Sequence, residues 1–165
     1  MQKMAFGLGH GECGSGVLQL VSSETGLPKI TGRYLRQSQG RDALDGDNSA
    51  MFLSKDERGP SLESNAAHIY STLIEHATLM RNKLREEMQI EFTIQDGDLH
   101  ILDGVRITRR AQAAVRIAVE LAKDGIINKE EALMRIEPRA IGELLHRQIS
   151  VQAERAQTHL SLIHI

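Results

Sequence analysis

The sequence predicts an α+β domain with an antiparallel sheet, and the order of its elements carries this prediction. Two short β-like runs come first, a long helical stripe follows, and a second hairpin then precedes several shorter helices. Regular alternation of strands and helices would indicate a parallel sheet, whereas this order favours antiparallel strands with separate helices. At 165 residues, the chain corresponds to about one domain.

The chain is expected to begin with a β-hairpin. Residues 17–21 and 29–35 have the composition of strands, and Gly26 and Pro28 supply the turn between them. The following stretch, residues 40–60, is polar and contains glycine. It is therefore predicted to be a long surface loop.

A long helix is predicted from its N-cap, Ser61, to about Met88, because apolar residues step by three and four along it. His68 and His76 are eight positions apart on this helix, too far for an i, i+4 metal pair, so they are expected on a solvated face. The apolar positions are Leu62, Ala66, Ile69, Leu73, Ala77, Met80, Leu84 and Met88.

A second hairpin is predicted from Met88 to about Val105, with Asp96-Gly97 marking a tight turn. A two-residue turn would pair Phe92 with Ile101 and would point Asp103 away from Glu91. A three-residue turn, 95–97, would place Glu91 and Asp103 on one face of the sheet.

Three shorter helices are predicted after the hairpin. Thr108 is placed to cap the first, which ends near Gly125. Asn128 and Glu131 have capping-box spacing before the second, residues 129–136. Pro138 can open the third, residues 138–146.

Composition excludes several classes of protein. The 20 basic and 22 acidic residues form no basic stripe, so no nucleic-acid partner is expected. No apolar run approaches membrane-spanning length, so no membrane partner is expected either. The single cysteine, Cys13, excludes an internal disulfide and is typical of a reducing compartment. A cytoplasmic location is the expectation that follows.

A glycine-rich stretch, GLGHGECGSG, occupies residues 7–16. A Rossmann loop needs a strand before it and a helix after it, and a Walker loop needs a lysine; both contexts are missing. His10, Glu12 and Cys13 match no common zinc spacing. The stretch is therefore interpreted as a turn with incidental polar residues.

Glu91 is the strongest candidate for a chemical role. It lies on a strand whose other face is apolar, so its carboxylate projects toward solvent or a cleft. Carboxylate oxygens are ligands that Mg²⁺ prefers, particularly where phosphates complete the coordination. The alternative is an ordinary surface glutamate, and the residue alone favours that alternative.

Four stretches resemble the later part of the nucleotide-binding region of the pyruvate, phosphate dikinase family, from about Ala5 to Gln148. They are AFG…GSGV…ETG, GRYLRQSQGRDALDG, MQIEFTIQDGDLHIL and RRAQAAVRIAVELAKDGIINKEEALMRIEP. The resemblance implies a partial ATP-grasp-like fold. Residues 1–107 would form the second half of that nucleotide-binding domain, and residues 108–159 a helical linker segment.

The resemblance also implies a reaction and its partners. Members of the family phosphorylate a swivelling histidine domain from ATP and then pass the phosphoryl group to pyruvate on a separate barrel domain. The implied cofactors are ATP and Mg²⁺. The implied partners are the N-terminal half of the nucleotide-binding domain, the phosphohistidine domain and the PEP/pyruvate domain. No catalytic residue falls in this chain, which is not expected to be catalytic alone.

Carried over residue by residue, the family site is only partly retained. The resemblance assigns nucleotide contacts to Glu91 and Asp103, with Glu91 as the metal ligand. Losing an arginine removes a bidentate phosphate donor, and losing one such contact commonly costs ~10²-fold in rate. The site is therefore interpreted as eroded. The changed positions are Val21 and Val105 for arginines, Arg33 for a glutamate, Gln89 for an aspartate and Asp103 for a glutamine.

Two other functions stay open. One is a non-catalytic interaction or regulatory module derived from the same fold. The other is a divergent nucleotide binder that uses Arg33 and Arg109 in new roles.

The final residues, 160–165 (LSLIHI), match the translation of a common transposase sequencing adapter. They are hypothesised to be a read-through tail, and a genuine short amphipathic end is the alternative.

Overall fold

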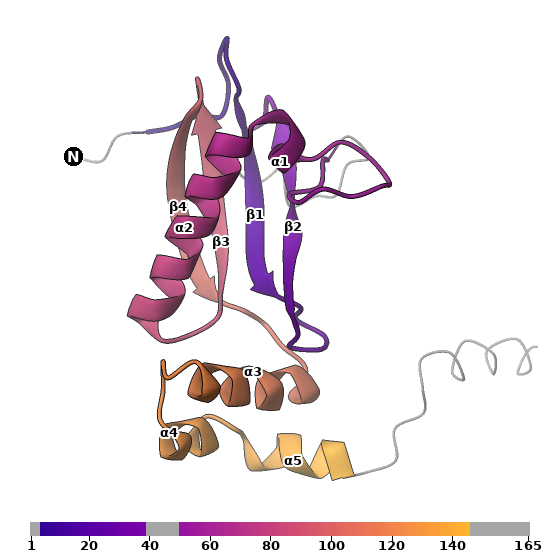
Figure 1. Ribbon diagram of the computed structural model, residues 1–165, viewed down its shortest axis with the longest axis vertical. Coiled ribbons are helices and arrows are strands. Elements are labelled where there is room, and N and C mark those ends of the chain that lie inside the picture. Colours follow the sequence, from indigo (N-terminus) through magenta and orange to yellow (C-terminus); the bar gives the residue numbers. More distant parts are fainter. Residues whose placement is uncertain (1–3, 39–49, 146–165) are drawn as a thin grey trace, which may run out of the picture.

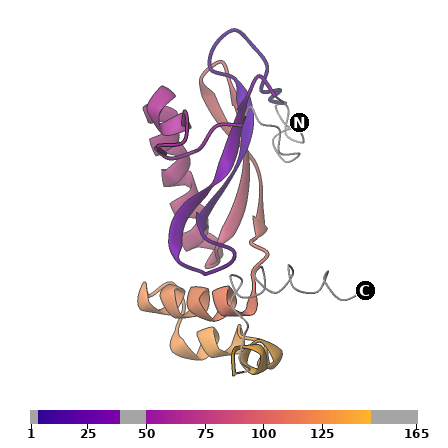
Figure 2. The same ribbon diagram turned by 90° about the vertical axis from the view of Figure 1, so that its right-hand side faces the viewer.

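The computed structural model describes residues 4–38 and 50–145. The fold is α+β: a four-stranded sheet carries one long helix on one face, and three helices lie beyond one end of the strands (Figures 1 and 2). The strands are β1 Gly14–Val21, β2 Pro28–Arg36, β3 Met88–Gln95 and β4 Asp98–Arg106. The helices are α1 Leu62–Asn65, α2 Ala67–Leu84, α3 Ala111–Lys123, α4 Lys129–Met134 and α5 Pro138–Leu145.

The sheet has the order β2-β1-β3-β4, and each neighbouring pair is antiparallel. Both predicted hairpins are confirmed, with strands a few residues longer than expected. The sequence-based fold class, α+β with antiparallel strands, is therefore correct. This arrangement is compatible with a partial ATP-grasp-like domain.

The main core lies between the sheet and α2. Ile90, Phe92 and Ile94 point to this side of β3 and are fully buried against Leu73 and Ala77 of α2. Burial of side chains of this size contributes about 1.5–3 kcal/mol each. The alternation of apolar and polar residues in β3 therefore decides which face of the sheet stays open.

Gly16 fixes how closely β1 approaches β3. A Cβ atom on Gly16 would lie 2.4 Å from the Phe92 ring, so this position of β1 has room only for hydrogen. The Phe92 ring in turn stacks on Tyr34, with ring centroids 6.2 Å apart. Burial and a hydrogen bond to Glu12 raise the pKa of Tyr34 well above its usual range.

The prediction that residues 40–60 form a surface loop is wrong at Met51 and Leu53. Met51 and Leu53 are 9% and 2% exposed and belong to the main core. The backbone of Met51 exchanges two hydrogen bonds with Tyr34, at 3.0 and 2.7 Å, which extends the sheet beyond β2. Residues 39–49 lie outside the described part of the chain.

The predicted long helix is divided and ends early. Ser61 is an N-cap as expected, since its Oγ accepts a hydrogen bond from the Ser64 N–H at 3.1 Å. Ala66, with φ −143°, separates α1 from α2. Arg85 adopts a left-handed conformation, φ 56°, and ends α2 before Met88, which begins β3. The apolar stripe continued across this boundary because both elements bury one face. His68 is exposed, as is His76.

The C-terminal helices follow the predicted order. The capping role predicted for Thr108 is wrong: Arg110 is the N-cap residue of α3 and makes no side-chain cap. Asn128 does cap α4, where its Oδ1 accepts from the Glu131 N–H at 2.7 Å, and Pro138 begins α5. Position 146, where the third helix was expected to end, and the proposed tail at 160–165 lie beyond the described residues.

These helices enclose a second core with Val21 at the end of β1. Its buried members include Ile107, Ile117 and Leu121, all at most 3% exposed. Among the described residues, no helix is long and apolar enough to cross a bilayer.

Candidate functional site

The predicted site residues lie on the sheet face opposite α2. In one row across the sheet, Arg33 of β2 pairs with Val17 of β1, Val17 pairs with Glu91 of β3, and Glu91 pairs with Asp103 of β4. Directly paired residues project from the same side of a sheet. Ile90 and Phe92, the two neighbours of Glu91, face α2, so this row faces away from it.

A β-bulge creates the Glu91–Asp103 pair. The turn has two residues, because Gln95 pairs with Asp98, and Phe92 pairs with Ile101. Leu102 is then an extra residue in β4, so Asp103 rather than Leu102 lies opposite Glu91. The alternative with a three-residue turn, 95–97, is wrong. The statement that a two-residue turn points Asp103 away from Glu91 is also wrong, because it omitted the bulge.

The two carboxylates are close and carry like charge. Directly opposed Cβ atoms in a sheet are about 4.5–5.5 Å apart, and such a like-charge pair is destabilising. Asp103 accepts a hydrogen bond from the Gly104 N–H at 2.7 Å, and neither carboxylate forms an ion pair with any described arginine or lysine. The pair therefore retains unneutralised oxygen atoms on an open face.

This donor set fits Mg²⁺ only together with another ligand. Mg²⁺ is commonly held by one or two carboxylates, with water and substrate phosphates completing an octahedron. Within residues 4–38 and 50–145, no three His, Cys, Asp or Glu side chains gather in metal-binding geometry. Glu91 and Asp103 are therefore suited to a metal ion that arrives with a phosphate group, and unsuited to a closed protein-only site.

The surrounding face is polar and internally hydrogen-bonded. Gln19 donates from Nε2 to Gln89 Oε1 at 2.7 Å, and the Ser15 and Thr93 hydroxyls are 2.9 Å apart. These pairs flank Glu91 because residues 89, 91 and 93 point to the same side of β3. Ser15 and Thr93 are 0% and 1% exposed, so their hydroxyl pair is covered, whereas Gln19 and Gln89 are only partly buried. The accessible part of the face therefore holds the two amides and the two carboxylates.

The other positions that the resemblance singled out have different environments. Arg33 is exposed and shares the row of Glu91, whereas Val105 is 44% exposed and pairs with Gln89 in the next row. Val21 is 7% exposed and packs into the second core. Since Val21 contributes to this packing, a charged residue at its position would disturb the core.

The glycine-rich stretch uses its backbone amides internally. The Asp96 carboxylate in the β3–β4 turn accepts from the N–H groups of His10 at 3.1 Å and Gly11 at 3.4 Å. These backbone bonds hold the pKa of Asp96 below its usual value. The Glu12 carboxylate accepts from the Tyr34 hydroxyl at 2.8 Å and from Arg36 at 2.9 Å. The side chain of Glu12 is thus structural, and the interpretation of this residue as incidental is wrong.

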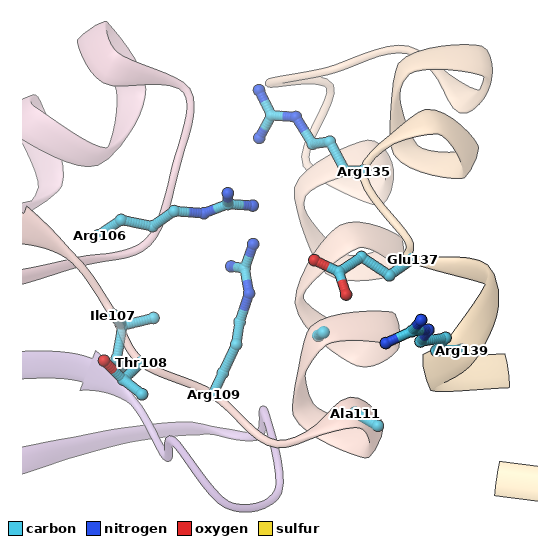
Figure 3. Close-up of a pocket in the computed structure, with 9 residues that line it drawn as sticks. Arg106, Ile107, Thr108, Arg109, Ala111, Arg135, Glu137 and Arg139 are labelled. Carbon is cyan, nitrogen blue, oxygen red and sulfur yellow. The ribbon is translucent and has the colours of Figure 1, made fainter. Parts of the chain in front are cut away.

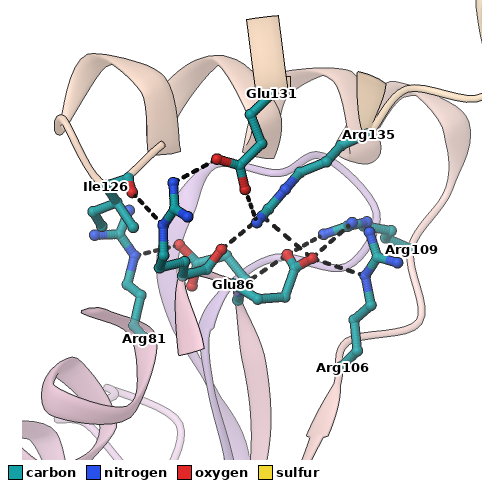
Figure 4. Close-up of polar contacts among 9 residues, drawn as sticks. Arg81, Glu86, Arg106, Arg109, Ile126, Glu131 and Arg135 are labelled. Carbon is teal, nitrogen blue, oxygen red and sulfur yellow. Dashed lines mark hydrogen bonds and ion pairs between the residues drawn. The ribbon is translucent and has the colours of Figure 1, made fainter. Parts of the chain in front are cut away.

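A cluster of arginines joins the sheet to the C-terminal helices (Figure 4). Glu86, whose side chain is 13% exposed, accepts a hydrogen bond from Arg109 at 2.8 Å and forms ion pairs with Arg106 at 2.9 Å and with Arg135 at 3.6 Å. Burial raises the pKa of Glu86, but the Arg109 hydrogen bond and charge outweigh it, so the pKa is lowered overall. Both terminal nitrogens of Arg109 donate hydrogen bonds to the Glu86 carboxylate. This weakens the alternative that gave Arg109 a nucleotide-binding role.

Sequence reasoning missed this cluster and the bulge at Leu102. The Arg-Glu-Glu run at residues 85–87 was a possible signal for the cluster, since three adjacent charges lie between a helix and a strand. It could not reveal the partners, because Arg106, Arg109 and Arg135 come from two later segments.

Comparison with known proteins identifies one group of relatives. No family model matches the chain. The chain is 33% identical over 149 residues to pyruvate, phosphate dikinase of Rickettsia prowazekii (strain Madrid E), covering 90% of this chain and 17% of that protein. It is 31% identical over 161 residues to the enzyme of that name from Rhizobium meliloti (strain 1021), covering 94% and 18%.

A third relative, pyruvate, phosphate dikinase of Clostridium symbiosum, is 31% identical over 156 residues, which cover 94% of this chain and 17% of that protein. The chain thus spans 17 to 18% of the length of these relatives. Similarity over at least 90% of the chain confirms the resemblance carried by the four sequence stretches. The chain is therefore a divergent sequence of the pyruvate, phosphate dikinase type that corresponds to one part of these proteins.

Proposed function

We propose that this chain supplies the second half of an ATP-grasp-like nucleotide-binding domain of a dikinase-like phosphotransferase, and that its nucleotide site is eroded. The observation that carries the proposal is the Glu91–Asp103 pair on the open face of the sheet. Two like charges in direct opposition cost stability, so a cation that bridges them with a phosphate gives a physical reason for the arrangement.

The proposed site would bind Mg-ATP weakly. Glu91 would ligate Mg²⁺, and Asp103 would contact the same metal–phosphate group from β4. Phosphoryl transfer depends on cations that neutralise developing charge, and Val21 and Val105 supply none. In the proposed site, Arg33 is the cation that shares the row of the two carboxylates. The chain alone is therefore proposed to bind nucleotide without transferring a phosphoryl group.

The partners proposed with this function are parts of a longer protein. An N-terminal half-domain would cover the polar face that holds Glu91. A phosphohistidine domain and a PEP/pyruvate domain would complete the reaction. The proposed boundaries are residues 1–107 for the nucleotide-binding half and 108–159 for the helical linker. A cytoplasmic location is proposed with them, because Cys13 is a free, buried thiol of the kind common in reducing compartments.

Calorimetry with Mg-ATP tests the proposal. Binding in the millimolar range is expected, and it should disappear without Mg²⁺ and in the Glu91→Gln variant. Glu24→Gln, which removes an exposed carboxylate from the turn between β1 and β2, is the matched control and should bind as the wild type does. The nucleotide site would be rejected if binding survives Glu91→Gln. It would also be rejected if no binding is detected at ~10 mM Mg-ATP, a concentration above the KM range of typical enzymes.

A second candidate is a non-catalytic interaction module. The observation that favours it is an apolar groove of 360 Å³ along α3 and α4, lined by residues such as Val119 and Leu133. Leu133 and the neighbouring Met134 are 71% and 88% exposed. Absence of Mg-ATP binding together with self-association that Leu133→Ser abolishes would favour this candidate.

A further inference from the structure

A cavity of 610 Å³ lies at the opposite end of the molecule from the glycine-rich stretch, between the end of β4, the start of α3 and the start of α5 (Figure 3). Its size is in the range of small-molecule sites, about 300–1,000 Å³. It shares no lining residue with the Glu91 row. Its charged lining residues are Arg106, Arg109, Arg135, Glu137 and Arg139.

The wall of the cavity carries an excess of positive charge. Four of the lining side chains are arginines and one is a glutamate. Behind the wall, Glu86 pairs with three of these arginines, and Glu131 is shared by Arg135 and Arg85. With Arg85 included, five arginines face three carboxylates, which leaves two positive charges uncompensated around one concave space.

Two of the arginines, Arg109 and Arg135, use their terminal nitrogens in hydrogen bonds within the protein. Arg109 uses both terminal nitrogens on Glu86, at 2.8 and 3.4 Å. Arg135 donates to the Arg85 carbonyl at 2.6 Å and to Glu131 at 2.7 Å. Their role is to hold α4 and the β4–α3 connection in place, and their charges contribute to the potential in the cavity.

The other two arginines keep donors available. Arg106 gives only its Nε to Glu86, at 2.9 Å, and its side chain is 57% exposed. Its two terminal nitrogens form no hydrogen bond with the described residues; the hydrogen bonds that Glu86 accepts from an arginine side chain come from Arg109. Arg139 is exposed and forms no ion pair within the described part of the chain. Figure 3 shows the Arg106 side chain extending toward the centre of the cavity and Arg139 on the opposite side of it, beyond Glu137.

The start of α3 adds to this potential. Ala111 lines the cavity, and the N-cap residue Arg110 makes no side-chain hydrogen bond to the first turn. The N-terminal end of a helix carries a partial positive charge, which favours an anion close to it. The arginines are the primary attraction, and the helix end strengthens it.

From these contacts we propose that the cavity binds a phosphate-bearing small molecule, with Arg106 and Arg139 donating to its phosphate oxygens. Guanidinium groups form charge-assisted, often bidentate hydrogen bonds to phosphate. The free donors come from β4 and α5, two different directions. A tetrahedral phosphate can accept from both, whereas a planar carboxylate presents its oxygens in one plane. Glu137 faces the same space and opposes the anion by charge repulsion.

Calorimetric titration of the full chain with inorganic pyrophosphate at low salt, without Mg²⁺, tests the proposal. Arg106→Gln and Arg139→Gln are each expected to weaken binding about tenfold, the usual effect of one charge-assisted hydrogen bond. Arg139→Gln keeps every described ion pair, so its effect cannot come from a damaged Glu86 cluster. Glu137→Gln is expected to tighten binding several-fold, because it removes the opposing charge.

Matched controls separate this site from the proposed nucleotide site. Arg58→Gln removes an exposed arginine far from the cavity and should leave pyrophosphate binding unchanged, and so should Glu91→Gln. The proposal is overturned if Arg139→Gln binds as the wild type does, if Arg58→Gln weakens binding equally, or if malonate binds as tightly as pyrophosphate. Absence of pyrophosphate binding at ~10 mM, where even weak anion sites fill, would also overturn it.

Discussion

Glu91 lies directly opposite Asp103 on the open face of the sheet because Leu102 is an extra residue in β4. Without this bulge, Asp103 would take the place of Gly104 on the side that faces α2. A Cβ at Gly104 would lie 2.4 Å from the Met80 methyl group, so a larger residue there would have to displace that side chain. The bulge thus places glycine next to α2 and Asp103 beside Glu91 on the other face.

Removing either charge from this pair should stabilise the protein in the absence of ligand. Asp103→Asn is expected to raise the free energy of unfolding by about 0.2–1 kcal/mol, because it relieves repulsion between directly opposed like charges. Urea unfolding at neutral pH measures the change. Asp98→Asn, in an exposed turn position of the same strand, is the control and should have little effect. A loss of stability in Asp103→Asn would show that the carboxylate has a structural partner.

The Glu86 cluster should dominate the attachment of the helices to the sheet. Glu86→Gln leaves three arginine side chains facing one another, so we expect a loss of about 2–4 kcal/mol, near the cost of breaking a buried ion pair. The exposed pair Arg58–Asp56 is the comparison, and Asp56→Asn should cost well under 1 kcal/mol. Equal effects of the two substitutions would contradict the structural role of Glu86.

The same cluster should make stability depend on pH. The pKa of Glu86 is lower in the folded state than its usual value of 4.5. The stabilisation is therefore fully present above that value and is lost as the pH falls through the lower folded pKa. Unfolding curves between about pH 6 and 3 should show a steeper loss for the wild type than for Glu86→Gln. Parallel curves would reject this source of acid sensitivity.

Asp96 should hold the glycine-rich stretch by its charge. Asp96 has φ 53°, a left-handed conformation that asparagine also accepts, so Asp96→Asn preserves the turn and removes the charge. Because the pKa of Asp96 is lowered from its usual value of 3.8, the stabilisation by its contacts is fully present above that value and is lost as the pH falls through the lower folded pKa. Hydrogen exchange should show less amide protection at His10 and Gly11 in Asp96→Asn at pH 6. Unchanged protection would mean that the carboxylate contributes nothing there.

Leu53 should behave as a core residue although it follows a polar stretch. It is 2% exposed, so Leu53→Ala is expected to cost about 2–4 kcal/mol. Leu133→Ala, at a position that is 71% exposed, serves as the control and should change stability by less than about 0.5 kcal/mol. Chemical denaturation of both variants gives the comparison. A neutral Leu53→Ala would restore the prediction of a surface loop.

Local patterns predicted most of the fold. Alternation in Ile90, Phe92 and Ile94, the Asp96-Gly97 turn and the Asn128 cap depend on residues close in sequence, and each prediction is confirmed. Predictions failed where a distant contact decides the structure. Met51 is buried by pairing with Tyr34, and Arg85 ends α2 in a left-handed turn that its own spacing did not indicate.

The sequence predicted on which face of the sheet Glu91 lies, but it did not predict which residue lies opposite it in β4. The alternation of β3 placed Glu91 away from the apolar face, which the structure confirms. The direction of the Asp103 side chain depends on the bulge at Leu102, which no pattern within the hairpin indicates. The arginine-lined cavity was also beyond prediction, because its residues come from β4, α3, α5 and the turns between them.

The measurement that tests the central claim most directly is an amide NMR titration with Mn²⁺ in the presence of ATP, where bound Mn²⁺ broadens nearby resonances. Our account predicts that broadening is strongest at Glu91, Thr93 and Asp103 and that it disappears in Glu91→Gln. Broadening centred on other elements, or none in this row at millimolar ATP, would contradict the claim that this face of the sheet is a nucleotide site.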